Sequence, residues 1–117
     1  MEQLELVKTI AKVLSDKKAQ NITALDVSHL TVITDYMVIA TGRSGLQVKA
    51  LADDVEDKLY ELGIPVRSKE GKNEGRWIVL DLGTVLVHIF HPEDREHYRL
   101  ERLWADGTNE IPLNLED

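Results

Sequence analysis

Four histidines are the side chains of this sequence best suited to metal binding or acid–base chemistry near neutral pH: His29, His88, His91 and His97. None belongs to a His-x-x-x-His or His-Glu-x-x-His pair, and the sequence has no cysteine to complete a ligand set. We therefore expect no metal site. His88 alone is more often a hydrogen-bonded sheet residue than a general base, because a general base needs an orienting partner.

The turn Gly42-Arg43-Ser44-Gly45 lies before a predicted helix, where backbone N–H groups can hold a phosphate. It lacks the Gly-Lys-Ser or Gly-Lys-Thr end of a P-loop and is no Gly-x-Gly-x-x-Gly fingerprint. A metal-dependent nucleotidyl transferase would also need clustered carboxylates such as Asp-x-Asp, which the sequence does not contain. The pattern favours a turn with a serine helix cap, and a nucleotide-binding enzyme is the rival interpretation.

Aromatic and polar residues occur at every second position along parts of a predicted hairpin. Period-two spacing puts Trp77 and Asp81 on one face of its first strand, and His88 and Phe90 on one face of its second. If the register aligns these faces, they form an aromatic patch rimmed by Asp81 and the loop of Glu70, the composition of a protein-binding hot spot. The alternative is a helix-covered face on which Trp77 and Phe90 are core. The pattern by itself favours core packing.

Hydrophobic spacing predicts the elements that must position these residues. Helices are expected at 4–14 and 46–62, with a short third helix within 92–104. Strands are expected at 20–27, 36–41, 77–81 and 85–90, with 36–41 central in the sheet. A further short strand is expected at 66–68, followed by an exposed loop at 69–75. This order predicts a mixed sheet with helices packed on it, of the α/β or α+β class.

The length of 117 residues suits one domain with one core, and no repeat or linker divides the chain. We expect a single domain at 1–106 and a loosely ordered acidic tail at 107–117. The absence of cysteine, of a signal peptide and of any apolar run near membrane-span length indicates a cytosolic protein. The net charge of -7 disfavours direct nucleic-acid binding and suits a basic protein partner, but solubility is the favoured explanation of the charge by itself.

Several motifs, read in order, resemble the ribosomal silencing factor (Iojap-related) family. They span about residues 4 to 106 and comprise Ala24-Leu25-Asp26-Val27, the run from Ile33 to Gly42, Glu70-Gly71, Trp77 to Asp81, Gly83, Val87 to Phe90, Arg95, Tyr98, and Leu100 to Trp104.

This resemblance implies a mixed five-stranded sheet flanked by helices, similar in outline to nucleotidyl transferases but without their catalytic carboxylates. It implies a non-enzymatic protein without a cofactor that binds large-subunit ribosomal protein number fourteen, blocks joining of the small subunit and damps translation when nutrients are scarce. A role in large-subunit assembly is the alternative, and a homodimer is also implied. The partner-binding face would comprise Glu70, Trp77, Asp81, His88, Phe90 and Tyr98.

Overall fold

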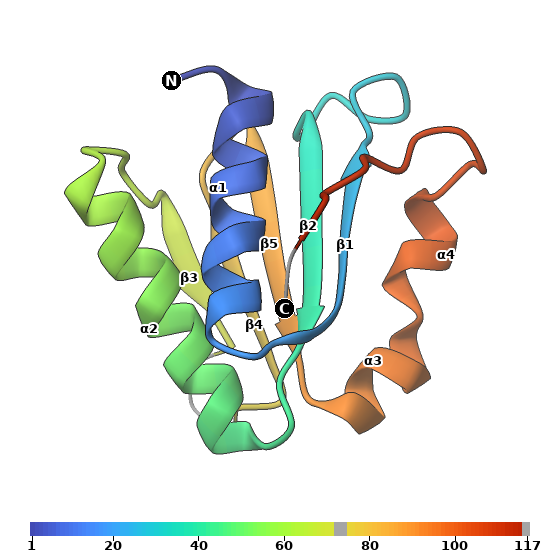
Figure 1. The fold of residues 1–117 in the computed structure, drawn as a ribbon. Helices are drawn as coiled ribbons and strands as arrows, with labels where there is room; N and C mark the ends of the chain where they lie inside the picture. Colours follow the sequence, from blue (N-terminus) through green and yellow to red (C-terminus); the bar gives the residue numbers. More distant parts are fainter. Residues whose placement is uncertain (72–74, 116–117) are drawn as a thin grey trace.

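The computed structural model describes residues 1–71 and 75–115. Its helices are α1 (Gln3–Asp16), α2 (Gly45–Glu61), α3 (Pro92–Tyr98) and α4 (Leu100–Trp104). Its strands are β1 (Gln20–Asp26), β2 (Tyr36–Thr41), β3 (Ser68–Glu70), β4 (Trp77–Asp81) and β5 (Val85–Phe90) (Figure 1). No helix in these two ranges is long and apolar enough to cross a membrane.

The strands form one five-stranded sheet in the order β1-β2-β5-β4-β3. Strands β2 and β5 are parallel and the other neighbours are antiparallel, so the predicted mixed sheet and the antiparallel hairpin are confirmed. Strand β2 has a strand on each side, as its continuous apolar sequence predicts, but β5 occupies the middle of the sheet.

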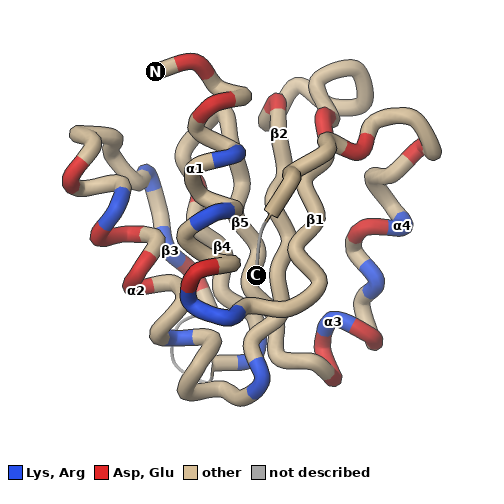
Figure 2. Tube along the Cα trace, viewed as in Figure 1, with Lys and Arg blue, Asp and Glu red and all other residues tan. Residues whose placement is uncertain are grey.

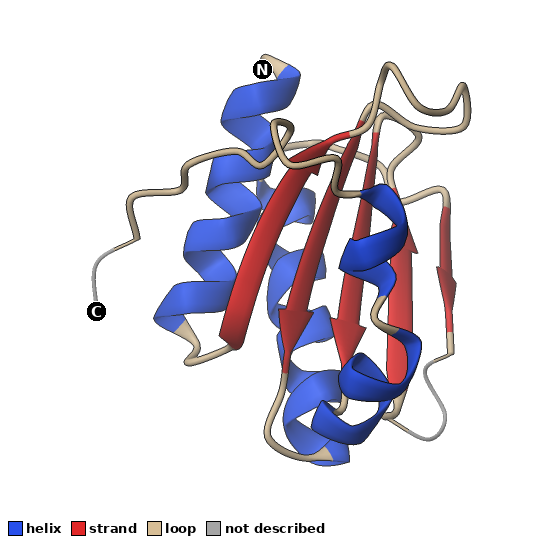
Figure 3. Ribbon diagram, turned by 90° about the vertical axis from the view of Figure 1, so that its right-hand side faces the viewer, coloured by secondary structure: helices blue, strands red, loops and turns tan. Residues whose placement is uncertain are grey.

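Helices α1 and α2 cover one face of the sheet, and α3 and α4 lie over the other (Figure 3). The main core lies under α1 and α2, which bury apolar residues at helical spacing. The buried residues of α2 are Val48, Leu51, Ala52, Val55 and Leu59. Leu46, in the first turn of α2, lies outside this buried stripe and is 81% exposed.

A second, smaller core lies on the face under α3 and α4. Its buried members are Leu25, Val27, Met37, Ile39 and Phe90. Neither α3 nor α4 has a buried residue of its own, and only Leu100 and Trp104 of α4 pack against this cluster as partly buried side chains. This layer is therefore a thin cover over an apolar sheet face.

The edge strand β3 begins later than expected. Residues 66–68 were assigned to it and Glu70 to an exposed loop, but the strand runs from Ser68 to Glu70. The Arg67 N–H donates to the Asp81 carbonyl at 2.7 Å, and Glu70 pairs with Val79, so β4 continues the pairing past the predicted end. Residues 72–74 of the predicted loop lie outside the described residues.

Residues 108–113 differ from the loosely ordered tail that we expected at 107–117, of which 116–117 lie outside the described residues. Asn109 is buried and its carbonyl accepts from the Asp26 N–H at 2.9 Å, while the Ile111 N–H donates to the Ala24 carbonyl at 2.8 Å. This segment thus follows the outer edge of β1, whose unpaired backbone groups it satisfies. Ile111 and Leu113 also pack against the main core.

Candidate functional site

The structure places the predicted site residues on one face of the sheet, the face under α3 and α4. Trp77 lies opposite Phe90, and Asp81 lies opposite Leu86, so the register of the hairpin does align the two faces. His88 and Glu70 both pair with Val79, from the strands on either side of β4. Because side chains alternate across a strand, all of these residues share one face. Tyr98 joins them from the last turn of α3.

Four rings on this face form an aromatic cluster: Trp77, His88, Phe90 and Tyr98. The Trp77 ring centroid lies 4.7 Å from that of Phe90 in a stacked arrangement, and 4.7 Å from that of Tyr98 in a tilted one. The His88 ring lies 6.0 Å from Trp77. Trp77 is therefore the common neighbour, with Phe90 on the sheet below it and Tyr98 supplied by α3. Such ring pairs stabilise by about 0.5–1.5 kcal/mol beyond the area they bury.

Burial divides the cluster into a base and an exposed part. Phe90 is fully buried and His88 is only 6% exposed, so for these two residues core packing is what the structure shows. Trp77 is partly buried and Tyr98 is 49% exposed. A partner that approaches this face without rearranging it therefore meets Tyr98 and the rim of Trp77.

A hydrogen bond connects the two parts. The indole N–H of Trp77 donates to Nδ1 of His88 at 3.1 Å. Because an indole can only donate, Nδ1 must be unprotonated, and the neutral ring then carries its proton on Nε2. Burial lowers the pKa of His88 to about 4, which keeps the ring neutral near pH 7. Nε2 is buried without a hydrogen-bond partner among the described residues. With Nδ1 occupied, His88 fits the role of an acceptor for Trp77 and not that of a general base.

The two carboxylates predicted for the site differ in their surroundings. Oδ1 of Asp81 accepts from the Gly83 N–H at 2.7 Å and so closes the turn between β4 and β5. Glu70 is exposed on the edge strand. Asp81 therefore has a structural task, and Glu70 is the freer of the two for contact with a partner.

The turn Gly42 to Gly45 is a helix cap, as the favoured interpretation predicts. The Ser44 side chain accepts from the Gln47 N–H at 3.2 Å, and the Arg43 N–H donates to the Gln47 side chain. Gly75 packs against Gly45 so closely that a Cβ on Gly75 would lie 2.4 Å from the Gly45 carbonyl oxygen. Amides that a phosphate would need are engaged within the chain, which gives the nucleotide-binding interpretation no support.

The histidines do not converge on a metal site. Within residues 1–71 and 75–115, no group of three or more His, Cys, Asp or Glu side chains is arranged to hold a metal ion. His91 instead caps α3 by accepting from the Glu93 N–H, and His29 lies 2.7 Å from a carboxylate oxygen of Asp106.

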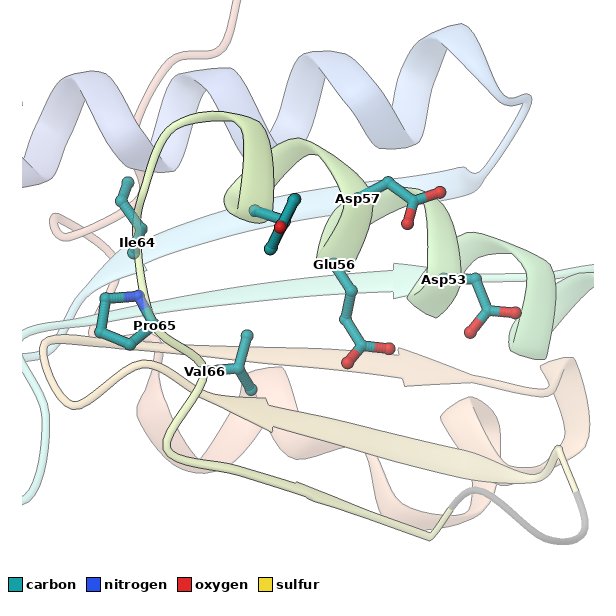
Figure 4. Close-up of a pocket in the computed structure, with 7 residues that line it drawn as sticks. Asp53, Glu56, Asp57, Ile64, Pro65 and Val66 are labelled. Atoms are coloured by element: carbon teal, nitrogen blue, oxygen red, sulfur yellow. The ribbon is translucent and has the colours of Figure 1, made fainter.

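A separate hollow of about 570 Å³ lies between α2 and the segment before β3. Figure 4 shows Asp53, Glu56 and Asp57 of α2 along its upper side. Two of these carboxylates bind the Lys69 ammonium, with Glu56 at 2.6 Å and Asp53 at 3.2 Å. The hollow contains none of the predicted site residues, and its carboxylates serve an ion pair that joins α2 to β3.

Comparison with known proteins assigns the chain to a family. A family model described as "Ribosomal silencing factor during starvation" matches residues 1–117. The chain belongs to this ribosomal silencing factor family. It is 42% identical over 107 residues to the Ribosomal silencing factor RsfS of Bacillus subtilis (strain 168), covering 92% of this chain and 91% of that protein. The family resemblance that the motifs indicated is thus confirmed.

More distant relatives include the plant Iojap proteins. The chain is 32% identical over 119 residues to the protein "Iojap, chloroplastic" of Zea mays, covering 98% of this chain and 50% of that longer protein. Among solved structures, a crystal structure from Chromobacterium violaceum superposes with a TM-score of 0.87 at 38% identity, with 97% of each chain covered. The α+β fold of the ribosomal silencing factor family is therefore confirmed by structure as well as by sequence.

Proposed function

We propose that this protein binds the large ribosomal subunit through the exposed part of the aromatic cluster, and that Trp77 and Tyr98 are its anchors. The observation that carries the proposal is the Trp77–Tyr98 ring pair, with 4.7 Å between the ring centroids. Tyr98 is 49% exposed and Trp77 is partly buried, and buried Phe90 and His88 support the pair from below. Aromatic side chains held on a rigid base are the residues that most often dominate protein interfaces. The family's description supports a ribosomal target.

The charge around the aromatic cluster supports a basic partner. Glu93 in the first turn of α3 and Glu70 on β3 are exposed carboxylates on this side of the sheet, whereas Asp94 is paired with Arg76. Figure 2 shows acidic segments on α3 and α4, the helices over this face, next to basic ones. An acidic rim around an aromatic centre complements a basic protein surface and speeds encounter with it. A ribosomal protein is such a partner, and the family resemblance points to large-subunit protein number fourteen.

The proposed mechanism needs no bond to be made or broken. A silencing factor seated where the small subunit docks excludes it sterically, so the fraction of silenced subunits equals the occupancy of the site. Affinity and concentration then set the strength of repression. This accounts for a small protein whose candidate site contains aromatic rings and a neutral histidine instead of a catalytic set.

Cosedimentation tests the proposal. The purified protein is centrifuged through sucrose gradients with separated large subunits, separated small subunits and joined ribosomes, at two salt concentrations. We expect it to travel with large subunits alone and to reduce the yield of joined particles when small subunits are added. A protein that stayed at the top of every gradient, or travelled with small subunits, would contradict the proposal.

A further inference from the structure

Helix α3 supplies Tyr98 to the aromatic cluster, yet hydrophobic burial does not hold this helix in place. It has seven residues and none of them is buried. It also ends abruptly, because Arg99 takes a left-handed conformation with φ of 47° and turns the chain into α4. Its apolar packing is limited to the rings that Tyr98 contacts, so polar contacts must supply the rest of its attachment.

Arg95 provides the strongest attachment of α3 to the sheet. Its side chain is only 12% exposed. The guanidinium donates from Nη1 to the Asn21 carbonyl at 2.9 Å and to Thr41 Oγ1 at 3.0 Å, and from Nη2 to Thr23 Oγ1 at 3.4 Å. These contacts tie α3 to both β1 and β2. A planar guanidinium can bind such divergent acceptors at once, whereas a lysine ammonium on one flexible stem cannot.

The same guanidinium also binds the helix that follows. Its Nε donates to Glu101 Oε1 of α4 at 2.8 Å. Arg95 precedes Tyr98 by one helical turn, and Glu101 follows Tyr98 by three residues. The bond between Arg95 and Glu101 therefore connects the two helices on either side of the turn at Arg99, next to Tyr98. This charge-assisted bond is sheltered, since the carboxylate of Glu101 is only 28% exposed.

A second attachment lies beside it in the sequence. Asp94, which is 16% exposed, accepts from Nη2 of Arg76 at 2.6 Å. Arg76 immediately precedes Trp77. This ion pair therefore connects α3 to the strand that carries the other exposed ring of the aromatic cluster.

We propose that Arg95 is a positioning residue of the ribosome-binding face, which sets Tyr98 against Trp77 by joining α3 and α4 to the ends of β1 and β2. The inference rests on the proposed function of the Trp77–Tyr98 pair. The position of Tyr98 relative to Trp77 then depends on a buried polar contact that the ribosome does not touch. Loss of Arg95 should then weaken binding through Tyr98 and not through a contact of its own.

A double-mutant cycle tests this dependence. The affinity for large subunits is measured for Arg95→Met, Tyr98→Ala and the double variant, with Arg102→Met, an exposed arginine of α4, as the matched control for lost charge. Each of the first two variants should bind about tenfold more weakly. The double variant should be about as weak as either one alone, because Arg95 has nothing left to position. Independent, multiplying losses, or full affinity of Arg95→Met, would overturn the inference.

A spectroscopic readout separates this inference from the proposed function. The indole N–H resonance of Trp77 in a ¹H–¹⁵N spectrum reports the ring of Tyr98 beside it, whether or not a ribosome is present. We expect Arg95→Met and Tyr98→Ala to shift it similarly and Arg102→Met to leave it in place. If Trp77→Ala and Tyr98→Ala both retain full affinity, the proposed function fails, while this resonance still decides whether Arg95 positions Tyr98.

Two milder variants guard against loss of the fold. Arg95→Lys keeps the charge, and Asp94→Asn breaks the second attachment without changing Arg95. Both should shift the Trp77 resonance partway toward its position in Tyr98→Ala, with circular dichroism confirming that the sheet is intact. An unchanged resonance in both variants would show that α3 is held by other contacts, and the inference would be withdrawn.

Discussion

The indole N–H of Trp77 donates a hydrogen bond of 3.1 Å to Nδ1 of His88, across the antiparallel pair β4–β5. The bond joins a partly exposed side chain to one that is 6% exposed. It leaves Nε2 of His88 buried and without a partner in the described part of the chain. A buried donor left in this way costs free energy that an apolar residue would not, so the arrangement is better explained by the orientation of Trp77 than by stability.

Acidification should destabilise the protein through His88. Burial lowers the pKa of His88 from 6.5 to about 4 in the folded state, so between these values the unfolded chain binds the extra proton. The part of the unfolding free energy that depends on His88 staying neutral is fully present above pH 6.5 and is lost as the pH falls toward 4. At 1.36 kcal/mol per pKa unit, this part amounts to roughly 3 kcal/mol. Urea unfolding at pH 7, 5.5 and 4.5 measures it. His88→Leu should show a flatter dependence over this range, and equal slopes in both proteins would refute the assignment.

The energies of Trp77 and His88 should be coupled. His88→Leu removes the acceptor of the indole N–H together with the orphaned Nε2 donor, and Trp77→Phe removes the indole N–H. We expect unfolding free energies from denaturant titrations to give a coupling energy of about 1 kcal/mol in a double-mutant cycle, the net worth of one hydrogen bond. Additive effects of the two substitutions would mean that the bond contributes nothing.

Asn109 should be a stability residue although it lies in the C-terminal segment. The side-chain NH2 of Asn109 donates to the backbone carbonyls of Asp26 and Trp104 at 2.9 and 2.8 Å, and the side-chain oxygen Oδ1 accepts from the Asp106 N–H. Asn109→Ala leaves these groups without their partner and should lower the unfolding free energy by about 2 kcal/mol. The neighbouring exposed side chain of Glu110 is the control, since Glu110→Ala should change stability by less than about 0.5 kcal/mol.

Gly71 should tolerate no side chain, because the chain passes very close to Trp77 there. Its φ is +80°, and a Cβ would lie 1.9 Å from the Trp77 carbonyl oxygen. Gly63 has a similar φ of +72° but nothing within 4 Å of the same position. Thermal melting should therefore show a small loss for Gly63→Ala, about 1 kcal/mol from the left-handed backbone, and a clearly larger loss for Gly71→Ala. Equal losses would mean that the contact with Trp77 yields easily.

The shared face of the candidate site could be predicted from the sequence because it depends on local periodicity. Alternation places Trp77 with Asp81, and His88 with Phe90, on single faces of their strands, and the short Gly83 turn makes the two strands neighbours. The pattern also favours core packing on this face, which Phe90 shows. That Trp77 stays partly exposed could not be predicted, because the cover of this face comes from elsewhere in the chain.

The errors have the same origin in contacts between distant segments. Lys69 looks like a loop residue in the sequence, but its ammonium lies beside Glu56 of α2, and its strand pairs with β4. The C-terminal segment is polar and follows a glycine, yet the side chain of Asn109 finds an acceptor on β1. Arg95 was recognised only as part of a family motif. Its acceptors at Asn21, Thr23 and Thr41 form a site only once β1 and β2 pair.

The affinity of Tyr98→Ala for isolated large subunits, compared with that of Tyr60→Ala, tests the central claim most directly. Both tyrosines are exposed, at 49% and 88%, but Tyr60 is on α2 across the sheet from the aromatic cluster. We predict that Tyr98→Ala binds about tenfold more weakly and that Tyr60→Ala binds like the unaltered protein. Both variants should keep the melting temperature of the unaltered protein. Equal affinities for the two variants, or a loss confined to Tyr60→Ala, would contradict the assignment of the ribosome-binding face to Trp77 and Tyr98.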